Sequence, residues 1–159
     1  MLRLLWLSLL VVVLDQWSKH WIVANFREYE VLTVWPVFNL TLVYNTGAAF
    51  SFLSDAGGWQ RWFFVTVAVL VSLVMVVWLS RLQPRERWTA VGLALVVGGA
   101  VGNLIDRIVL GKVVDFLQWH WQDWYWPSFN VADSAITLGV VLLLIDGLFG
   151  SRPHEEENS

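Results

Sequence analysis

The sequence predicts an α-helical polytopic membrane protein that crosses a bilayer four times and carries a small sheet on one side. Three observations support this fold class. Hydrophobic residues make up 57% of the chain and charged residues only 14%, which is too apolar for an ordinary soluble domain. Four segments approach the roughly 20 apolar residues that a bilayer-spanning helix needs. A further stretch alternates apolar and polar residues, as a strand with one buried face does.

The expected spans cover residues 4–24, 62–79, 88–105 and 131–149. Asp15 and Lys19 interrupt the first of them and no clear small-x-small cleavage site follows, which favours a retained span over a cleaved secretion signal. The short loop SRLQPRER between the second and third spans is rich in arginine, and positive charge in short loops marks the cytoplasmic side. We therefore expect this loop and both ends of the chain to be cytoplasmic.

Two segments remain for the outer face. The stretch VFNLTLVYN, residues 37–45, predicts a half-buried strand of a small sheet that rests on the membrane. A turn at Gly47 and a short apolar stretch suited to the interface follow it. Residues 112–130 concentrate tryptophan and tyrosine, which favour the headgroup level, so we expect this segment to lie along the bilayer surface.

The third span combines a packing pattern with a polar end. Small residues recur every fourth position in ALVVGGAVG, from Ala94 to Gly102, and such a stripe lets another helix approach closely. Asn103, Asp106 and Arg107 occupy the last turn, within reach of one another. Close helix packing accounts for the small residues, whereas the polar residues indicate a site.

Ionisable residues also lie within the first and fourth spans. Asp15 and Lys19 are spaced i, i+4, so they can form an internal ion pair that lowers the cost of insertion. Such residues are also functional candidates by default, and the spacing is compatible with both interpretations. Asp146, near the inner end of the fourth span, is expected to reach the interface or a helix partner, and we assign it no role.

Two carboxylates are expected at the outer membrane face. Asn130 and Asp133 have the spacing of a helix N-cap with an acidic residue in the first turn. Asp115 lies just beyond the third span with two apolar neighbours on each side, which capping does not explain. Two carboxylates close enough to share a proton can activate a water and polarise a peptide carbonyl, as in aspartic peptidases. Spacing alone favours a structural role, because residues 18 positions apart need not touch.

Other functional classes are weighed on the same residues. A transporter or proton channel would spread its charges through the membrane depth, whereas most polar residues here gather near one face. A Ser–Lys peptidase would use Lys19 as base and Ser51, Ser128 or Ser134 as nucleophile. A zinc peptidase is disfavoured because the histidines are scattered and no H-E-x-x-H motif occurs. A non-enzymatic scaffold would leave the polar cluster unexplained.

Five blocks of the sequence resemble a known family. LDQWSK, YNTGAAFSFL, GGAVGNLIDR, VVDF and FNVADSAI follow one another in the order typical of the lipoprotein signal peptidases, bacterial signal peptidase II. The resemblance implies an aspartic endopeptidase of the bacterial cytoplasmic membrane. It would remove signal peptides from prolipoproteins by cutting before a cysteine that carries diacylglycerol, and globomycin would inhibit it. It also implies four spans, cytoplasmic termini, an outer β-cradle and an active site near the outer face.

The resemblance assigns roles to eight residues. The catalytic pair falls on Asp115 and Asp133. The substrate-binding residues implied by the family blocks are Asp15, Lys19, Asn45, Asn103, Arg107 and Asn130.

The remaining expectations concern organisation and partners. Residues 1–150 are expected to form one membrane-embedded peptidase domain, and residues 151–159 a disordered cytoplasmic tail. The expected partners are diacylglyceryl-modified prolipoproteins and membrane lipid. We expect a monomer that uses no cofactor and no metal and binds no nucleic acid.

Overall fold

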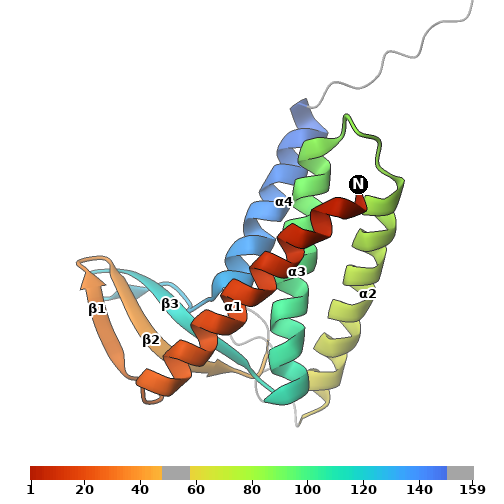
Figure 1. Ribbon diagram of the computed structural model, residues 1–159. Coiled ribbons are helices and arrows are strands. Elements are labelled where there is room, and N and C mark those ends of the chain that lie inside the picture. Colours follow the sequence, from red (N-terminus) through yellow and green to blue (C-terminus); the bar gives the residue numbers. More distant parts are fainter. Residues whose placement is uncertain (48–57, 150–159) are drawn as a thin grey trace, which may run out of the picture.

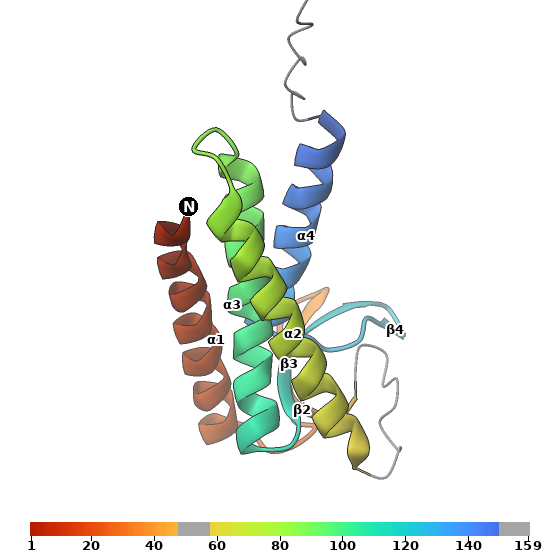
Figure 2. The same cartoon turned by 90° about the vertical axis from the view of Figure 1, so that its right-hand side faces the viewer.

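Four long helices and a four-stranded antiparallel sheet make up the residues that the computed structural model describes, 1–47 and 58–149. The helices run side by side, and the sheet projects from one end of the bundle (Figures 1 and 2). A 3₁₀ turn, η1 (Leu2–Leu4), leads into the first helix. The elements that follow are α1 (Leu5–Asn25), β1 (Val31–Trp35), β2 (Phe38–Asn45), α2 (Trp59–Arg81), α3 (Arg87–Val109), β3 (Val113–Trp121), β4 (Trp124–Tyr125) and α4 (Val131–Phe149).

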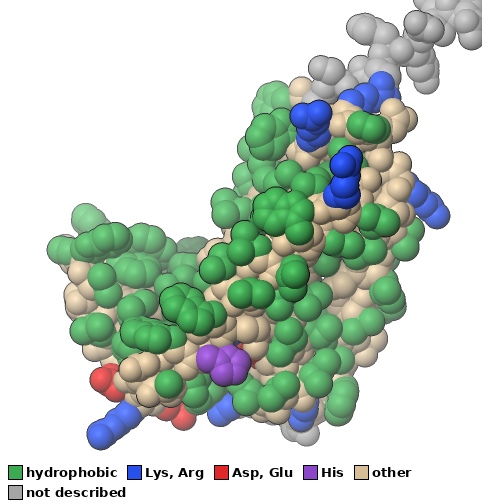
Figure 3. Space-filling model, in the orientation of Figure 1, with side chains coloured by type: hydrophobic (Ala, Val, Ile, Leu, Met, Phe, Trp, Pro, Cys, Tyr) green, Lys and Arg blue, Asp and Glu red, His purple; other side chains and the backbone are tan. Residues whose placement is uncertain are grey.

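Each predicted span is a helix with bounds close to those expected. Within the described part of the chain, α2, α3 and α4 are long and apolar enough to cross a membrane. The first helix, α1, has 21 residues but carries a polar group in its middle, including Asp15 and Lys19, and both of these side chains are buried. On the face that Figure 3 shows, hydrophobic side chains make up much of the surface between the two ends of the bundle, and Lys and Arg side chains lie towards those ends. The predicted α-helical polytopic fold with a small sheet is confirmed.

Small residues allow α3 to pack closely against two neighbours. A Cβ atom added at Gly98 would lie 2.8 Å from Val11 Cβ of α1, and the Ser8 hydroxyl donates to the Ala94 carbonyl over 2.7 Å. On another side of α3, a Cβ atom at Gly92 would lie 2.9 Å from the Gly139 carbonyl oxygen of α4. The predicted stripe of small residues is therefore confirmed as a helix contact, with α1 as the partner.

Polar groups within the bundle find partners on neighbouring helices. Asp146 of α4 accepts a hydrogen bond from the Thr89 hydroxyl of α3, near the end of the bundle opposite the sheet. This contact agrees with the expected helix partner of Asp146.

The sheet has the strand order β1-β2-β3-β4. The predicted strand is confirmed as β2, which pairs antiparallel with β1 and β3. The residues of β3 and β4 had been expected only as an interfacial segment, and β1 was not predicted. Their β-branched and aromatic residues are typical of strands. β3 pairs with β2, which is distant in the sequence, whereas β1 and β4 pair with the strands next to them in the chain, β2 and β3.

A small apolar core ties the sheet to α1. Ile22 of α1 packs with Leu42 of β2 and with Val114 and Phe116 of β3. Because successive residues of a strand point to opposite faces, the residue between the last two, Asp115, points away from this core. The fold thereby directs a carboxyl group to the other face of the sheet, next to the start of α4.

Candidate active site

The start of α4 brings Asp133 to the sheet. The Asn130 side chain accepts a hydrogen bond from the Asp133 backbone N–H over 2.9 Å, and an Asp133 carboxylate oxygen accepts one from the Asn130 backbone N–H over 3.2 Å. This reciprocal pair is a capping box, which satisfies backbone N–H groups that a helix N-terminus leaves free. The predicted cap is confirmed, and it holds the Asp133 carboxyl in one place.

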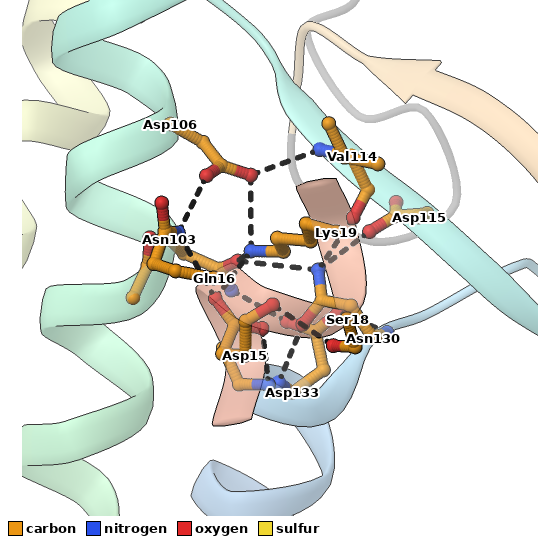
Figure 4. A network of polar contacts seen from close by, with 12 residues as sticks. Asp15, Gln16, Ser18, Lys19, Asn103, Asp106, Val114, Asp115, Asn130 and Asp133 are labelled. Carbon is orange, nitrogen blue, oxygen red and sulfur yellow. Dashed lines mark hydrogen bonds and ion pairs between the residues drawn. The ribbon is translucent and has the colours of Figure 1, made fainter. Parts of the chain in front are cut away.

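Asn130 also contacts the other carboxyl group. Its side-chain oxygen is occupied by the Asp133 backbone N–H, so its NH₂ group must face the opposite direction. There it donates to Asp115 Oδ1 over 2.7 Å and to the Val114 carbonyl over 3.2 Å (Figure 4). One fully buried asparagine therefore links Asp115 and Asp133.

Two further asparagines bind the same carboxyl groups. Asn103 of α3 donates to Asp133 Oδ1 over 2.7 Å, and Asn45 of β2 donates to Asp115 Oδ2 over 3.1 Å. Each of these amides has its orientation set by a second contact. The Asn103 oxygen accepts from Lys19 Nζ over 2.9 Å, and the Asn45 oxygen accepts from the Gly47 backbone N–H over 3.0 Å.

The surroundings of Asp115 favour its protonated form. The side chain is only 3% exposed. Burial, followed by the neighbouring negative charge of Asp133, raises the pKa of the Asp115 carboxyl to about 7. The amide donors of Asn45 and Asn130 and the charge of Lys19 act in the opposite direction, but they are the smaller effects. Near neutral pH this pair can therefore hold one proton between two carboxyl groups.

A buried charge cluster lies behind this pair, defined here as the ionic cluster of Asp15, Lys19 and Asp106. Lys19 Nζ lies 2.8 Å from Asp15 Oδ2 and 3.0 Å from Asp106 Oδ2, and each of the three side chains is at most 4% exposed. Asp15 Oδ1 also accepts from the Ala132 backbone N–H over 2.9 Å, which joins α1 to the first turn of α4. The predicted i, i+4 ion pair is confirmed, with a second carboxylate added from α3.

A cavity of about 680 Å³ lies in front of the two carboxyl groups, bounded by α3, α4 and the sheet. Five of the eight predicted site residues line it: Asn45, Asn103, Arg107, Asp115 and Asp133. The other three, Asp15, Lys19 and Asn130, are buried and do not line the cavity. Asn130 hydrogen-bonds both Asp115 and Asp133, and Asp15 and Lys19 belong to the ionic cluster.

Arg107 lies at the edge of this cavity. Its guanidinium donates to the Gly47 carbonyl over 3.1 Å, and it sits over the Phe64 ring with 5.1 Å between Cζ and the ring centroid. These contacts connect α3 to the end of β2 and to α2. The cation is thereby held beside two carboxyl groups without a direct ion pair to either in the described contacts.

Sequence reasoning missed two residues at this site. Asp106 was noted only for its place in a polar last turn, and Gln16 was not noted. Gln16 Nε2 donates to Asp106 Oδ1 over 2.8 Å and to the Gly102 carbonyl over 3.2 Å. The available signal was spacing: Gln16 follows Asp15 directly, and Asp106 lies one turn after Gly102.

The described residues include no group of three or more His, Cys, Asp or Glu side chains that could hold a metal ion. The cavity walls instead supply amides, carboxyl groups and one guanidinium. Such a set can bind an extended peptide backbone and exchange a proton with water.

Comparison with known proteins identifies the family. Residues 7–149 match the family described as signal peptidase (SPase) II. The chain is 56% identical over 154 residues to a lipoprotein signal peptidase of Pseudomonas aeruginosa (strain UCBPP-PA14), with 96% of this chain and 90% of the relative covered. A lipoprotein signal peptidase of Pseudomonas putida (strain KT2440) is 58% identical, with the same shares covered.

Solved structures agree with this result. Two structures described as bacterial membrane enzymes, determined by the in meso method at 2.3 Å and 1.9 Å, superpose with TM-scores of 0.84 and 0.80 at 29% sequence identity. The superposition with the first structure covers 100% of this chain and 94% of the solved chain, and that with the second covers 95% of this chain and 96% of the solved chain. The family match across nearly the whole chain, the relatives and the shared fold lead to one conclusion: this chain belongs to the signal peptidase II family and is a membrane peptidase.

Proposed function

We propose that this peptidase removes signal peptides from prolipoproteins with Asp115 and Asp133 as its catalytic carboxyl groups. The observation that carries the proposal is their common environment: both line one cavity and both bind Asn130. The names of the relatives support the class of substrate.

The two carboxyl groups divide the work of hydrolysis. Asp115 holds the shared proton because its pKa is raised to about 7, and it hydrogen-bonds the scissile carbonyl oxygen. Ionised Asp133, at the N-terminus of α4 where negative charge is favoured, accepts a proton from water as the water oxygen attacks the carbonyl carbon. The proton of Asp115 passes to the carbonyl oxygen. The intermediate then collapses: the C–N bond breaks, Asp133 returns its proton to the leaving amine, and Asp115 recovers its own.

The position of the cavity suits a substrate anchored in lipid. It opens among apolar side chains that include Trp119, Trp126 and Leu138, beside the polar groups of the carboxyl pair. A diacylglyceryl-modified cysteine can keep its acyl chains in the bilayer while the peptide bond before it reaches the two carboxyl groups. The substrate is therefore a prolipoprotein cut on the N-terminal side of its lipidated cysteine.

The alternative Ser–Lys chemistry has weaker support. Ser128 and Ser134 line the cavity, but Lys19 does not, and all three N–H donors of its ammonium group are taken by Asp15, Asp106 and Asn103. A general base needs a free lone pair within reach of the nucleophile. Ser51, the third candidate nucleophile, lies outside the described residues.

The test replaces each carboxyl group separately in purified protein, with a diacylglyceryl-modified prolipoprotein as substrate. Asp115→Asn and Asp133→Asn keep the size of the side chain and one of its two acceptor oxygens, so both proteins should insert and bind substrate while cleavage falls by several orders of magnitude. The double variant should be scarcely worse than either single variant, because the groups act as one unit. Ser128→Ala and Ser134→Ala serve as controls and should cleave. Near-normal cleavage by Asp133→Asn, or loss of cleavage in a serine variant, would reject the carboxyl pair.

We further propose the bacterial cytoplasmic membrane as location, a monomer as the working form, and an active site near the outer face with both termini inside. The arginine-rich loop between α2 and α3 supports this orientation. Because the chain contains no cysteine, single cysteines introduced at Gln83 and Gln122 report accessibility directly. Gln122 should react with an impermeant thiol reagent in intact cells and Gln83 only after lysis; the reverse pattern would invert the orientation. Asp55, also expected outside, and the tail 151–159 lie outside the described residues.

A further inference from the structure

The carboxyl group of Asp106 makes contacts that lead to both members of the catalytic pair. It lies in the last turn of α3 and is 4% exposed. Its Oδ2 atom accepts from Lys19 Nζ over 3.0 Å and from the Val114 backbone N–H over 3.1 Å (Figure 4). Its Oδ1 atom accepts from Gln16 Nε2 over 2.8 Å. A single side chain thus joins α3 to α1 and to β3.

One route from Asp106 leads to Asp115. Val114 directly precedes Asp115 in β3, and its backbone is held from both sides: its N–H by Asp106 and its carbonyl by the Asn130 side chain. The position of β3 relative to α3 is therefore set one residue before the carboxyl group that faces the cavity. Without Asp106, the Val114 N–H would be a buried donor with no partner from α3.

The other route leads to Asp133. An ammonium group can only donate, so Lys19 requires the oxygen of the Asn103 amide and turns the NH₂ group of that amide towards Asp133. Asp106 holds Lys19 in the place from which it does so. Asp15, at 2.8 Å, already provides Lys19 with a counter-ion, so charge balance alone does not call for a second carboxylate.

We propose that Asp106 is a positioning residue that sets the spacing between the catalytic carboxyl groups, because it anchors the backbone next to Asp115 and the lysine that orients Asn103 towards Asp133. The proposal rests on the catalytic role proposed for that pair. Asp106 acts through hydrogen-bond geometry and does not touch the substrate.

The decisive comparison is between Asp106→Leu and Asp106→Asn. Leucine keeps a branched side chain of similar shape but removes both acceptors, while Lys19 keeps its ion pair with Asp15. Asparagine can keep the two contacts on which the proposal rests, because its oxygen can take the place of Oδ2 and accept from Lys19 and the Val114 N–H. Gln16 can rotate its amide to accept from the new NH₂ group, with loss of its bond to the Gly102 carbonyl. Asp146→Leu is the matched control, because it removes a hydrogen-bonded carboxyl group from α4 about 20 Å along the helix from Asp133.

We expect kcat of Asp106→Leu to fall about 100-fold with KM nearly unchanged, the scale of loss for a misplacement of about 1 Å. Asp106→Asn should recover most of this loss, and Asp146→Leu should keep the wild-type kcat. The pH profile gives a second readout, because wider spacing weakens the repulsion that raises the pKa of Asp115. The alkaline limb of kcat should therefore move to lower pH in Asp106→Leu.

In Asp106→Leu, the other charged groups around Asp115 either lower its pKa as well or keep their positions. Lys19, released from one carboxylate, would lower the pKa of Asp115 further. The groups that surround Asp115 from the packed elements are Asp133 of α4, Arg107 and Asp106 of α3, Asp15 and Lys19 of α1, and the Asn45 amide of β2. A loss of fold stability alone would lower the active fraction and leave the pH limb unmoved.

Each outcome decides the proposal. Wild-type kcat and pH profile in folded Asp106→Leu would overturn it, and equal losses in the Asn and Leu variants would assign the role to charge and overturn it too. If Asp106→Leu does not insert, Asp106→Ala removes the same acceptors and leaves room for water at Val114 N–H; the same fall in kcat is then required. Asp115→Asn and Asp133→Asn are assayed alongside. If those two still cleave, the catalytic pair itself is rejected; if they do not, an unaffected Asp106→Leu rejects only the positioning role.

Discussion

Lys19→Met tests how the ionic cluster contributes to stability. The ionic cluster has one cation, Lys19, and two carboxylates, so it carries one net negative charge. Each of its three side chains is at most 4% exposed. Methionine fills a similar volume but leaves Asp15 and Asp106 without a counter-ion. Removing one partner of a buried ion pair costs about 3–5 kcal/mol. At about 2–4 °C per kcal/mol for a chain of this size, the midpoint of thermal unfolding should fall by roughly 6–20 °C.

The assay is thermal unfolding in detergent, followed by the fluorescence of the 12 tryptophans. Lys112, the other lysine of the chain, sits over the Tyr44 ring, and Lys112→Met should cost no more than about 1 kcal/mol. A second substitution separates charge from packing. Lys19→Met with Asp106→Asn restores the net charge of the cluster, so this double variant should be more stable than Lys19→Met alone. The electrostatic reasoning would be refuted if the unfolding midpoint of the double variant fell by the sum of the falls in the two single variants. It would also be refuted if Lys19→Met had the same unfolding midpoint as the wild type.

Because the pKa of Asp115 is raised to about 7, kcat should fall as pH rises through that value, and a flat kcat up to pH 9 would contradict this. The unfolded chain releases the same proton near pH 4, so folding stability should decline from about pH 4 to 7, and Asp115→Asn should flatten this decline. A Cβ atom at Gly99 would collide with the Ala132 carbonyl oxygen, so Gly99→Ala should destabilise by about 1–3 kcal/mol in thermal unfolding and lower cleavage, whereas Gly147→Ala, with nothing within 4 Å, should do neither. Saturating globomycin should block cleavage, and undiminished cleavage would count against the proposed catalytic pair.

The local parts of this structure could be predicted from the sequence. A helix in lipid satisfies its backbone within its own segment, so about 20 apolar residues specify a span without reference to the rest of the chain. The capping box at Asn130 and Asp133 is equally local, since its two partners lie three residues apart. The stripe of small residues on α3 likewise predicted a close helix contact, although not that α1 would be the partner.

The parts that sequence reasoning missed depend on distant segments. The strand character of β3 follows from its pairing with β2, and the orientation of Asn103 follows from Lys19, 84 positions away. The contact between Asn45 and Asp115 spans 70 positions. No periodicity within one segment encodes such contacts, so residues 112–130 were read from their aromatic content alone.

The sequence by itself determined the membrane class, the four helices, the cap of α4 and the residue types of the site. It left open whether the two carboxyl groups line one cavity and which polar residues form hydrogen bonds with them. Tertiary structure decided both, because it placed Asn130 between Asp115 and Asp133 and added Asp106 to the pair of Asp15 and Lys19. The physical reason is burial: a charge or amide removed from water needs partners on every side, and in this bundle those partners come from α1, α3, α4 and β3, which only folding brings together.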